Sequence, residues 1–426
     1  MKLKAKGLIA ICVGVGMAAA MTACSSGGSS GGSNGGNVTL DWGFWDQGDA
    51  GNKTWQGLAD AVHKKYPNIT VKLTSPPFAD YFTKLQSQLA ANTTPCIVSM
   101  QSLRLPAFAS AMEPLTDYSS ELGFTASDWN AGALKALQYQ GKQYAIPYGF
   151  STMVMYYNKD LFAKAGVAEP KNGWTIDEFE ADAKKITAAT GKPAFGQSFS
   201  DLHMFSLLLA DNGAVPVTSG GKLDLTSSTM KDAFGWYSGL STSQKVASVP
   251  ASSSDIPWGE QQLVAGNVAM AVDGTWNLSS NATQAGFKIG VVTLPQGANG
   301  GGTFSANSGF GISKTCANKK EAAQAISVIT GAEGSATAAE QGNVPARTAN
   351  MPLFVKSLAD QVDPKNPGYS TQVEATMAAS SKNAVPFIST DSWDQTTKAI
   401  AREFILSYTG SQSPAQSLQN VQNSSK

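Results

Sequence analysis

Four acidic residues are the first candidates for chemistry, because a pair of carboxylates can hydrolyse a glycosidic bond. The two groups of such a pair need only lie close in space, whatever their separation in the sequence. The candidates are Asp46, Asp201, Asp273 and Asp394. Carboxylates also accept hydrogen bonds from hydroxyl groups and cap helices. We favour this second role, because nothing else in the chain indicates turnover.

Other catalytic and cofactor-dependent chemistries find little support. The chain has two histidines, His63 and His203, and no cluster of cysteines, which argues against a zinc site. The nucleophile pattern G-x-S-x-G occurs only at Gly27–Gly31 and Gly31–Gly35, inside a Ser/Gly-rich stretch. No phosphate-binding G-x-x-x-x-G-K-[ST] motif is present. We therefore expect no cofactor and no metal.

Aromatic residues at the ends of predicted elements indicate carbohydrate binding. Trp45 lies at the carboxyl end of the first predicted strand, where open α/β sheets bind ligands. Phe150, Trp276 and Trp393 occupy comparable positions. A single buried ring is more often packing than ligand contact. Rings combined with a few placed polar groups, however, suit the apolar faces and hydroxyl groups of a sugar.

The first part of the chain predicts the scaffold for these residues. Strands are expected at 38–45, 69–75 and 96–100, with helices at 55–66 and 78–92 between them. This β-α-β-α-β order predicts a parallel sheet covered by helices.

The rest of the chain continues the α/β pattern. A capping box at Thr175 and Glu178 opens a helix that Gly191 closes. A turn is expected at Asp273-Gly274, directly after a strand at 268–272. Other strands are expected at 153–158, 194–198, 287–295 and 309–313. Helices are expected at 203–213 and 321–330, and the chain from about Met351 onward is mostly helical.

The N-terminus has the features of an exported, lipid-anchored protein. Three lysines precede an apolar stretch that is short for a membrane-spanning helix, so we expect a signal peptide at 1–23. The order Met21-Thr22-Ala23-Cys24 resembles a bacterial lipobox, in which the cysteine carries the lipid. The Ser/Gly-rich residues that follow predict a flexible tether at 24–36, with a reach of about 19 Å.

Composition limits the remaining possibilities. The chain has 31 basic and 31 acidic residues, and loss of the three signal-peptide lysines leaves a net charge of about −3. This near balance argues against nucleic acid as a partner. About 390 residues follow the tether, which predicts two lobes. Cys96 and Cys316 either form one disulfide or remain two buried thiols.

Several segments together resemble the extracellular solute-binding proteins of ABC importers, in the branch that includes maltose-binding protein. They occur in the family's order along the chain: IPYGFSTMVMYYNKDLFAKAG (146–166), WTIDEFEADAKKI (174–186), VAGNVAMAVDGTW (264–276), GFGISKTCANKKEAAQAI (309–326) and GNVPAR (342–347). The resemblance implies an α/β fold of two lobes, each an open, mostly parallel sheet flanked by helices. It also implies a three-stretch hinge that is crossed near Gly149, Ala306 and Pro345. One lobe would then comprise 37–149 and 306–344, and the other 150–305 and 345–426.

The resemblance also implies a set of ligand-binding residues and a disulfide. The residues it places against the sugar are Trp45, Asp46, Gln47, Phe150, Ser151, His203, Trp276, Arg347, Trp393 and Asp394. Two of these residues have an alternative role that stays open: Arg347, near the third crossing, as a brace for the hinge, and His203 as a satisfied helix histidine. The strands that carry Cys96 and Cys316 are neighbours in the family's sheet, which favours a bridge between them.

The sequence therefore predicts a sugar-binding subunit of an ABC importer, with an oligosaccharide as its ligand and no enzymatic activity. We expect a monomer on the outer face of the cell membrane, held there only by a lipid, such as palmitate, on Cys24, and partnered by permease subunits. Two alternatives stay open. One is an exported glycoside hydrolase that uses a carboxylate pair. The other is a binder of the same fold for a non-sugar solute, such as a polyol or a glycerophosphodiester.

Overall fold

The computed structural model describes residues 36–256 and 258–425, and one compact unit begins at Asn37. The predicted signal peptide, Cys24 and nearly all of the tether lie outside the described residues.

The first three strands form the expected parallel arrangement. Strand β1 (Val38–Gly43) pairs in parallel with β2 (Ile69–Thr74) on one side and β3 (Ile97–Gln101) on the other. Helices α1 (Gly48–Lys65) and α2 (Phe78–Ala90) connect them. Alternating apolar residues in β1 and β2, with a helix after each, produce this layer. The β-α-β-α-β prediction is confirmed.

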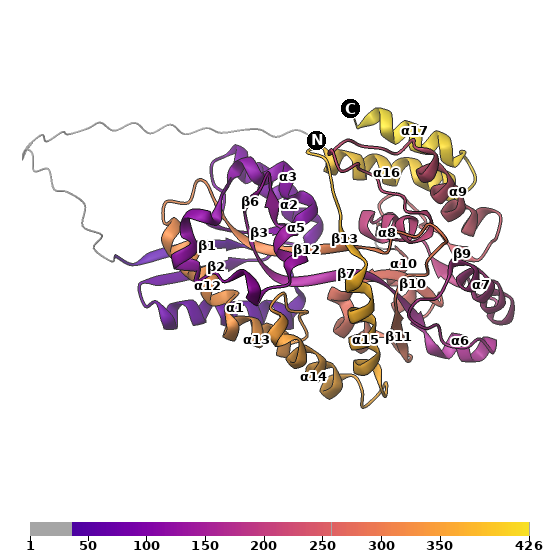
Figure 1. The fold of residues 1–426 in the computed structure, drawn as a ribbon, viewed down its shortest axis with the longest axis horizontal. Helices are drawn as coiled ribbons and strands as arrows, with labels where there is room; N and C mark the ends of the chain where they lie inside the picture. Colours follow the sequence, from indigo (N-terminus) through magenta and orange to yellow (C-terminus); the bar gives the residue numbers. More distant parts are fainter. Residues whose placement is uncertain (1–35, 257, 426) are drawn as a thin grey trace, which may run out of the picture. The chain divides into compact units, whose positions relative to one another are not determined.

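Two long strands occupy the centre of the sheet (Figure 1). Strand β7 (Ile146–Asn158) and β12 (Thr303–Ser313) pair antiparallel, with an irregularity between Ser308 and Gly309. Across the sheet, β2, β1 and β3 are followed by β12 and then by β7, beyond which a second group of strands begins, so β7 and β12 link one group of strands to the other. An isolated antiparallel bridge between Gly149 of β7 and Pro345 brings a third segment of the chain beside these two strands. These features lie at the predicted crossings, whereas the exact lobe boundaries stay a prediction.

The second group of strands is again parallel away from the centre. Strands β10 (Met270–Gly274), β8 (Phe195–Gly196) and β9 (Ala247–Ser248) run parallel to one another, and β10 and β11 (Ile289–Val292) each pair antiparallel with β7. The predicted two-lobed α/β fold class is confirmed. The prediction gave each lobe a sheet of its own, whereas in the described residues the strands of both groups form one continuous sheet. That sheet is parallel in its outer parts and antiparallel around β7 and β12.

Helices and short strands complete the fold. The helices are α3 (Leu105–Phe108), α4 (Ser119–Leu122), α5 (Ala131–Ala136), α6 (Lys159–Ala165), α7 (Ile176–Thr190), α8 (Asp201–Asn212), α9 (Ser228–Thr242), α10 (Trp258–Val264), α11 (Leu278–Gln284), α12 (Lys319–Ile329), α13 (Ala332–Glu340), α14 (Met351–Gln361), α15 (Tyr369–Lys382), α16 (Trp393–Tyr408) and α17 (Pro414–Ser424). The short strands are β4 (Met112–Glu113), β5 (Gln138–Tyr139), β6 (Lys142–Gln143) and β13 (Ala384–Pro386). The mostly helical C-terminal part is confirmed.

Local sequence signals determine how α7 begins and ends. The Thr175 hydroxyl accepts a hydrogen bond from the Glu178 amide (3.2 Å), and the Glu178 carboxylate accepts one from the Thr175 amide (2.8 Å). Gly191 ends the helix with a φ of 70°, a conformation that favours glycine. The predicted capping box and helix end are confirmed.

Buried side chains gather in separate hydrophobic clusters. The first includes Trp42, Trp55 and Phe310 and belongs to the β1–β3 part of the molecule. The second surrounds β8, α8 and α9, and the third lies between β7, β11 and helices α14 and α15. The structure also joins Cys96 to Cys316, with the two Cα atoms 4.6 Å apart. This bridge connects the residue just before β3 to the turn that follows β12.

Candidate ligand-binding site

Trp276 is the most accessible of the four aromatic residues predicted to bind sugar. Its exposed fraction is 40%, against 6% for Trp45, 7% for Phe150 and 2% for Trp393. It lies in the short 3-10 turn η5 (Thr275–Asn277), at the carboxyl end of β10. A Cβ atom on Gly274 would lie 2.2 Å from a carbon of the Trp276 ring. The ring therefore packs directly against the Gly274 backbone, an approach that only glycine permits.

Asp273 organises the backbone below this ring. The expected turn at Asp273-Gly274 is wrong in position, because β10 continues through Gly274 and the chain turns at η5. The Asp273 carboxylate is 1% exposed and accepts hydrogen bonds from the Gly274 amide (2.7 Å) and from the side chains of Asn277 (3.0 Å) and Asn281 (2.8 Å). These donors satisfy a buried carboxylate that would otherwise be costly.

His203 connects Asp273 to a second acid. The Nε2 atom of His203, on α8, lies 3.2 Å from the Asp273 carboxylate and 3.3 Å from that of Glu260, on α10. Burial lowers the pKa of the imidazole, but the two carboxylates outweigh this effect and raise that pKa to about 9. Burial raises the pKa of Glu260. The His203 ring meets the Trp276 ring edge-on, with centroids 6.1 Å apart.

A second polar group surrounds Trp393 at the start of α16. The Trp393 indole nitrogen donates a hydrogen bond of 2.7 Å to Asp201. The guanidinium of Arg104 forms an ion pair with Asp394 and stacks on Phe82, 4.5 Å from the ring centroid. Burial lowers the pKa of Arg104, and the nearby Asp201 carboxylate opposes that shift.

These contacts join segments from both predicted lobes. Arg104 belongs to the turn η1 (Ser102–Arg104) after β3, whereas Asp394 lies in the C-terminal part of the chain. The Leu103 carbonyl in the same turn accepts a hydrogen bond from Ser389, and the Leu103 side chain belongs to the hydrophobic cluster around α8 and α9. The η1 turn thus reaches across to the second half of the molecule.

The residues after β1 differ in how far they are exposed. Trp45 is buried, and the rings of Phe78 and Tyr81 pack edge-on against it at 5.6 and 5.4 Å. Asp46 is exposed and accepts a hydrogen bond of 2.6 Å from Asn52. Gln47 is half-buried. Aromatic residues at the start of α2 cover the indole, and the strand's own sequence carries no signal for that packing.

The hinge residues are also enclosed. Phe150 and Ser151 lie in β7 opposite Asn307 and Ala306 of β12, and both are 7% exposed.

Arg347 is held by three residues of the first predicted lobe. Its guanidinium bonds to Asp128 (2.9 Å) and to the Thr330 carbonyl (2.9 Å), and it lies 4.0 Å from the centroid of the Trp129 ring. The role of Arg347, in sugar contact or in bracing the hinge, stays a prediction.

Two charged residues of the site, Arg104 and Glu260, were absent from the predicted set. Arg104 is one of three arginines in the chain and follows a predicted strand, a combination that could have indicated a binding role. No local sequence signal points to Glu260, because its place in the site depends on a contact between two helices: its carboxylate, on α10, meets His203, on α8.

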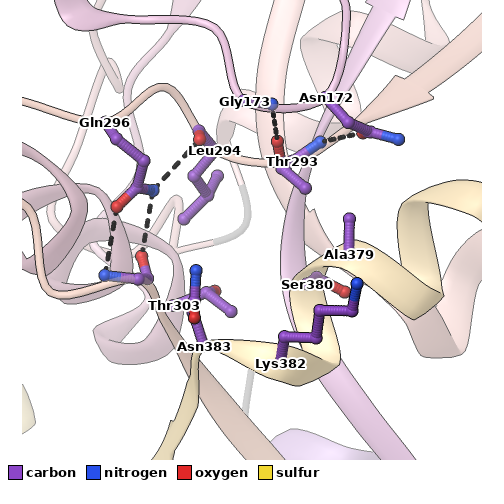
Figure 2. A pocket seen from close by; sticks show the side chains of 11 residues that line it. Asn172, Gly173, Thr293, Leu294, Gln296, Thr303, Ala379, Ser380, Lys382 and Asn383 are labelled. Carbon is purple, nitrogen blue, oxygen red and sulfur yellow. Dashed lines mark hydrogen bonds between the residues drawn. The ribbon is translucent and has the colours of Figure 1, made fainter.

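A cavity of about 280 Å³ lies elsewhere, between α15 and the segment that joins β11 to β12. Its walls include Asn172, Gln296 and Lys382, and none of the predicted ligand-binding residues lines it. Figure 2 shows that Asn172 and Gln296 are hydrogen-bonded to backbone groups of the cavity wall. These side chains therefore stabilise the wall.

Within residues 36–256 and 258–425, no three or more histidine, cysteine or acidic side chains are grouped in a way that could hold a metal ion. Likewise, none of the helices there is both long and apolar enough to cross a membrane.

Comparison with known proteins identifies the family. The model of the family described as bacterial extracellular solute-binding protein matches residues 46–336, more than half of the chain. The chain belongs to this family. The family assignment made from the sequence motifs is confirmed. So is the sugar-binding branch, the one that includes maltose-binding protein, because similar proteins of this family bind sugars.

Individual relatives match over shorter stretches. The diacetylchitobiose binding protein DasA of Streptomyces coelicolor is 31% identical over 143 residues, 33% of this chain and 32% of that protein. The arabinooligosaccharide-binding protein of Bacillus subtilis is 25% identical over 190 residues, 44% of each chain. The matched stretches thus span less than half the length of these relatives.

Among solved structures, the similarity extends over almost the whole fold. The ABC substrate-binding protein Lmo0181 from Listeria monocytogenes, in complex with cycloalternan, is 27% identical with a TM-score of 0.79, covering 91% of this chain and 97% of that one. CpMnBP1 with mannotriose bound is 22% identical with a TM-score of 0.74, covering 92% and 100%. The second likeness is one of fold alone.

Proposed function

We propose that this protein binds an oligosaccharide and delivers it to the permease of an ABC importer. The observation that carries the proposal is the exposed Trp276 ring, seated on Gly274 at the carboxyl end of β10. An exposed indole offers a flat apolar face to the C–H groups of a sugar, while nearby polar groups bind hydroxyls. The named ligands of DasA, the arabinooligosaccharide-binding protein and Lmo0181 are all oligosaccharides, which supports the same class here.

Closure of the two halves around the sugar would provide the transport signal. Arg104 and Asp394 come from opposite predicted lobes and already meet through their side chains. A sugar that contacts both lobes favours the closed state by the difference in its affinity for the closed and open states. We include Asp46, Gln47, Phe150 and Ser151 as further proposed contacts, together with Trp45 and Trp393.

Isothermal titration calorimetry tests the ligand class. The panel contains diacetylchitobiose, arabino-oligosaccharides, cycloalternan, mannotriose and maltotriose, with a polyol and a glycerophosphodiester as non-sugar ligands. We expect heat of binding from at least one sugar, and at least tenfold weaker binding in Trp276→Ala, the loss of about 1.4 kcal/mol. Leu406→Ala, at an exposed apolar position on α16, is the control. A folded protein that binds none of the sugars would contradict the proposal.

We propose that the protein has no enzymatic activity. Asp273 is buried among hydrogen-bond donors and Asp394 is paired with Arg104, so neither carboxylate is arranged as a free acid or base. Prolonged incubation with each bound sugar, followed by chromatography of the products, tests this. Cleavage that disappears on substitution of Asp46, Asp201, Asp273 or Asp394 would instead establish the hydrolase alternative.

We also propose that the mature protein is a monomer tethered to the outer face of the cell membrane through a lipid on Cys24. The lipobox and the Ser/Gly tether support this. Cys24→Ala should move the protein from the membrane fraction to the soluble fraction, and continued membrane attachment would contradict the lipid anchor. Light scattering tests the monomeric state.

A further inference from the structure

The turn that carries Trp276 is tied to a single buried carboxylate. Asp273 accepts hydrogen bonds from the backbone just before the turn, at Gly274, and from the side chains of Asn277 within the turn and Asn281 after it. Tyr156 adds a hydrogen bond of 2.8 Å to the Gly274 carbonyl. The backbone under the Trp276 ring is therefore restrained on both sides.

The same carboxylate depends on a neighbouring cation. Asp273 and Glu260 lie on either side of His203 Nε2, at 3.2 and 3.3 Å. Two buried carboxylates that both contact the same ring nitrogen repel each other unless that ring carries a positive charge. The Nδ1 atom of His203 and the Oε2 atom of Glu260 are buried without a hydrogen-bond partner in the described residues. These two atoms are thus enclosed by protein.

We propose that His203, Glu260 and Asp273 are positioning residues for sugar binding, which hold the η5 turn and thereby the Trp276 ring in its stacking orientation. His203 then acts through Trp276, with which it makes an edge-on contact, and does not touch the sugar. The inference rests on the proposed function for the identity of the ligand only. The restraint on the ring can be measured without any ligand.

The charge of His203 makes this restraint dependent on pH. Asp201 on α8 is the remaining acid near His203. The other titratable groups around the network are three tyrosines: Tyr156 on β7, Tyr237 on α9 and Tyr369 on α15. Burial raises the pKa of each tyrosine well above 10, so all three stay neutral below that pH. The pKa of His203 is about 9. Above this pH the imidazole loses its proton, the two carboxylates face each other without a cation, and the turn loosens.

Nuclear magnetic resonance of the indole N–H groups tests the restraint directly. Trp276→Phe identifies the Trp276 signal. In the otherwise unchanged protein we expect that signal to shift with a midpoint near pH 9, and His203→Gln to abolish the shift. His63→Gln, which removes the chain's other histidine from the exposed face of α1, is the control and should leave the titration intact. A Trp276 signal that does not change between pH 7 and 10 would overturn the inference.

Sugar binding provides the second measurement. With any sugar that binds, His203→Gln should weaken affinity about tenfold at pH 7.5, comparable to the loss of one buried hydrogen bond. The variant should also lose the fall in affinity that the unchanged protein shows above pH 9. If Glu260→Gln and His203→Gln both fold and leave affinity and its pH profile unchanged, the inference is wrong. A Trp276 signal that titrates as expected while no sugar binds would instead refute the proposed function and leave the positioning network in place.

Discussion

Removal of the Cys96–Cys316 bridge should strongly destabilise the part of the molecule built on β1–β3. The two cysteines are 220 residues apart, so the bridge closes a very long loop. The chain-entropy relation gives about 5 kcal/mol of stabilisation for a loop of this length. Domains are usually stable by only about 5–15 kcal/mol, so the bridge would supply a large fraction of the total. The double variant Cys96→Ala/Cys316→Ala should therefore unfold at a much lower urea concentration.

Tryptophan fluorescence during urea unfolding measures this loss. Trp42 and Trp55 are buried in the same hydrophobic cluster as Cys316 and report on the relevant part of the fold. Reductant should lower the unfolding midpoint of the unchanged protein and leave that of the double variant unaltered, which makes the double variant its own control. In a chain that begins at Asn37, these are the two remaining cysteines. Two alkylatable thiols in the unreduced, denatured protein would refute the bridge, and equal midpoints would refute the magnitude.

Three further predictions concern the site. Gly274→Ala should displace the Trp276 ring, because the new Cβ would lie 2.2 Å from it, and should weaken sugar binding at least tenfold in calorimetry, whereas Gly57→Ala, with open space around its Cβ, should not. The pKa of His203 is raised from 6.5 to about 9, so the stability that its charged form contributes is complete below pH 6.5 and is lost as the pH rises through 9. In urea unfolding, His203→Gln should not show this loss of stability. Identical pH profiles of stability for the variant and the unsubstituted protein would contradict the prediction. Arg104→Ala removes the guanidinium that joins the two halves, so small-angle X-ray scattering of the ligand-free protein should give a larger radius of gyration; an unchanged scattering curve would show that this ion pair does not hold the halves together.

Local signals in the sequence predicted local structure well. The capping box at Thr175 and Glu178 involves residues three apart, so its two hydrogen bonds form within one helical turn. Strands β1 and β2 alternate apolar and polar residues, β3 is a short apolar run, and the helices between the three strands require parallel pairing. The length of β7 was underestimated, because Pro147 and Gly149 indicate a break. In the fold, β12 pairs with β7 over this stretch and maintains the extended backbone.

The site could be predicted only in part, because it depends on contacts between residues that are far apart in the sequence. Trp276 follows a strand and is exposed, whereas Trp45 also follows a strand but is covered by rings from α2. The difference comes from the neighbouring helix and not from either tryptophan's own segment. Glu260 could not be predicted for the same reason: α8, α10 and β10 must fold together before its carboxylate meets His203.

The course of β7 and β12 has a consequence for how the protein can bend. Both strands pass between the two halves inside one hydrogen-bonded ladder, and the bridge at Gly149 and Pro345 lies beside them. A flexible loop accepts many orientations at similar energy, whereas a paired ladder resists bending and responds mainly by changing its twist. The resistance of such a ladder is elastic, so the energy stored on closing would help to reopen the molecule after the bound molecule is released.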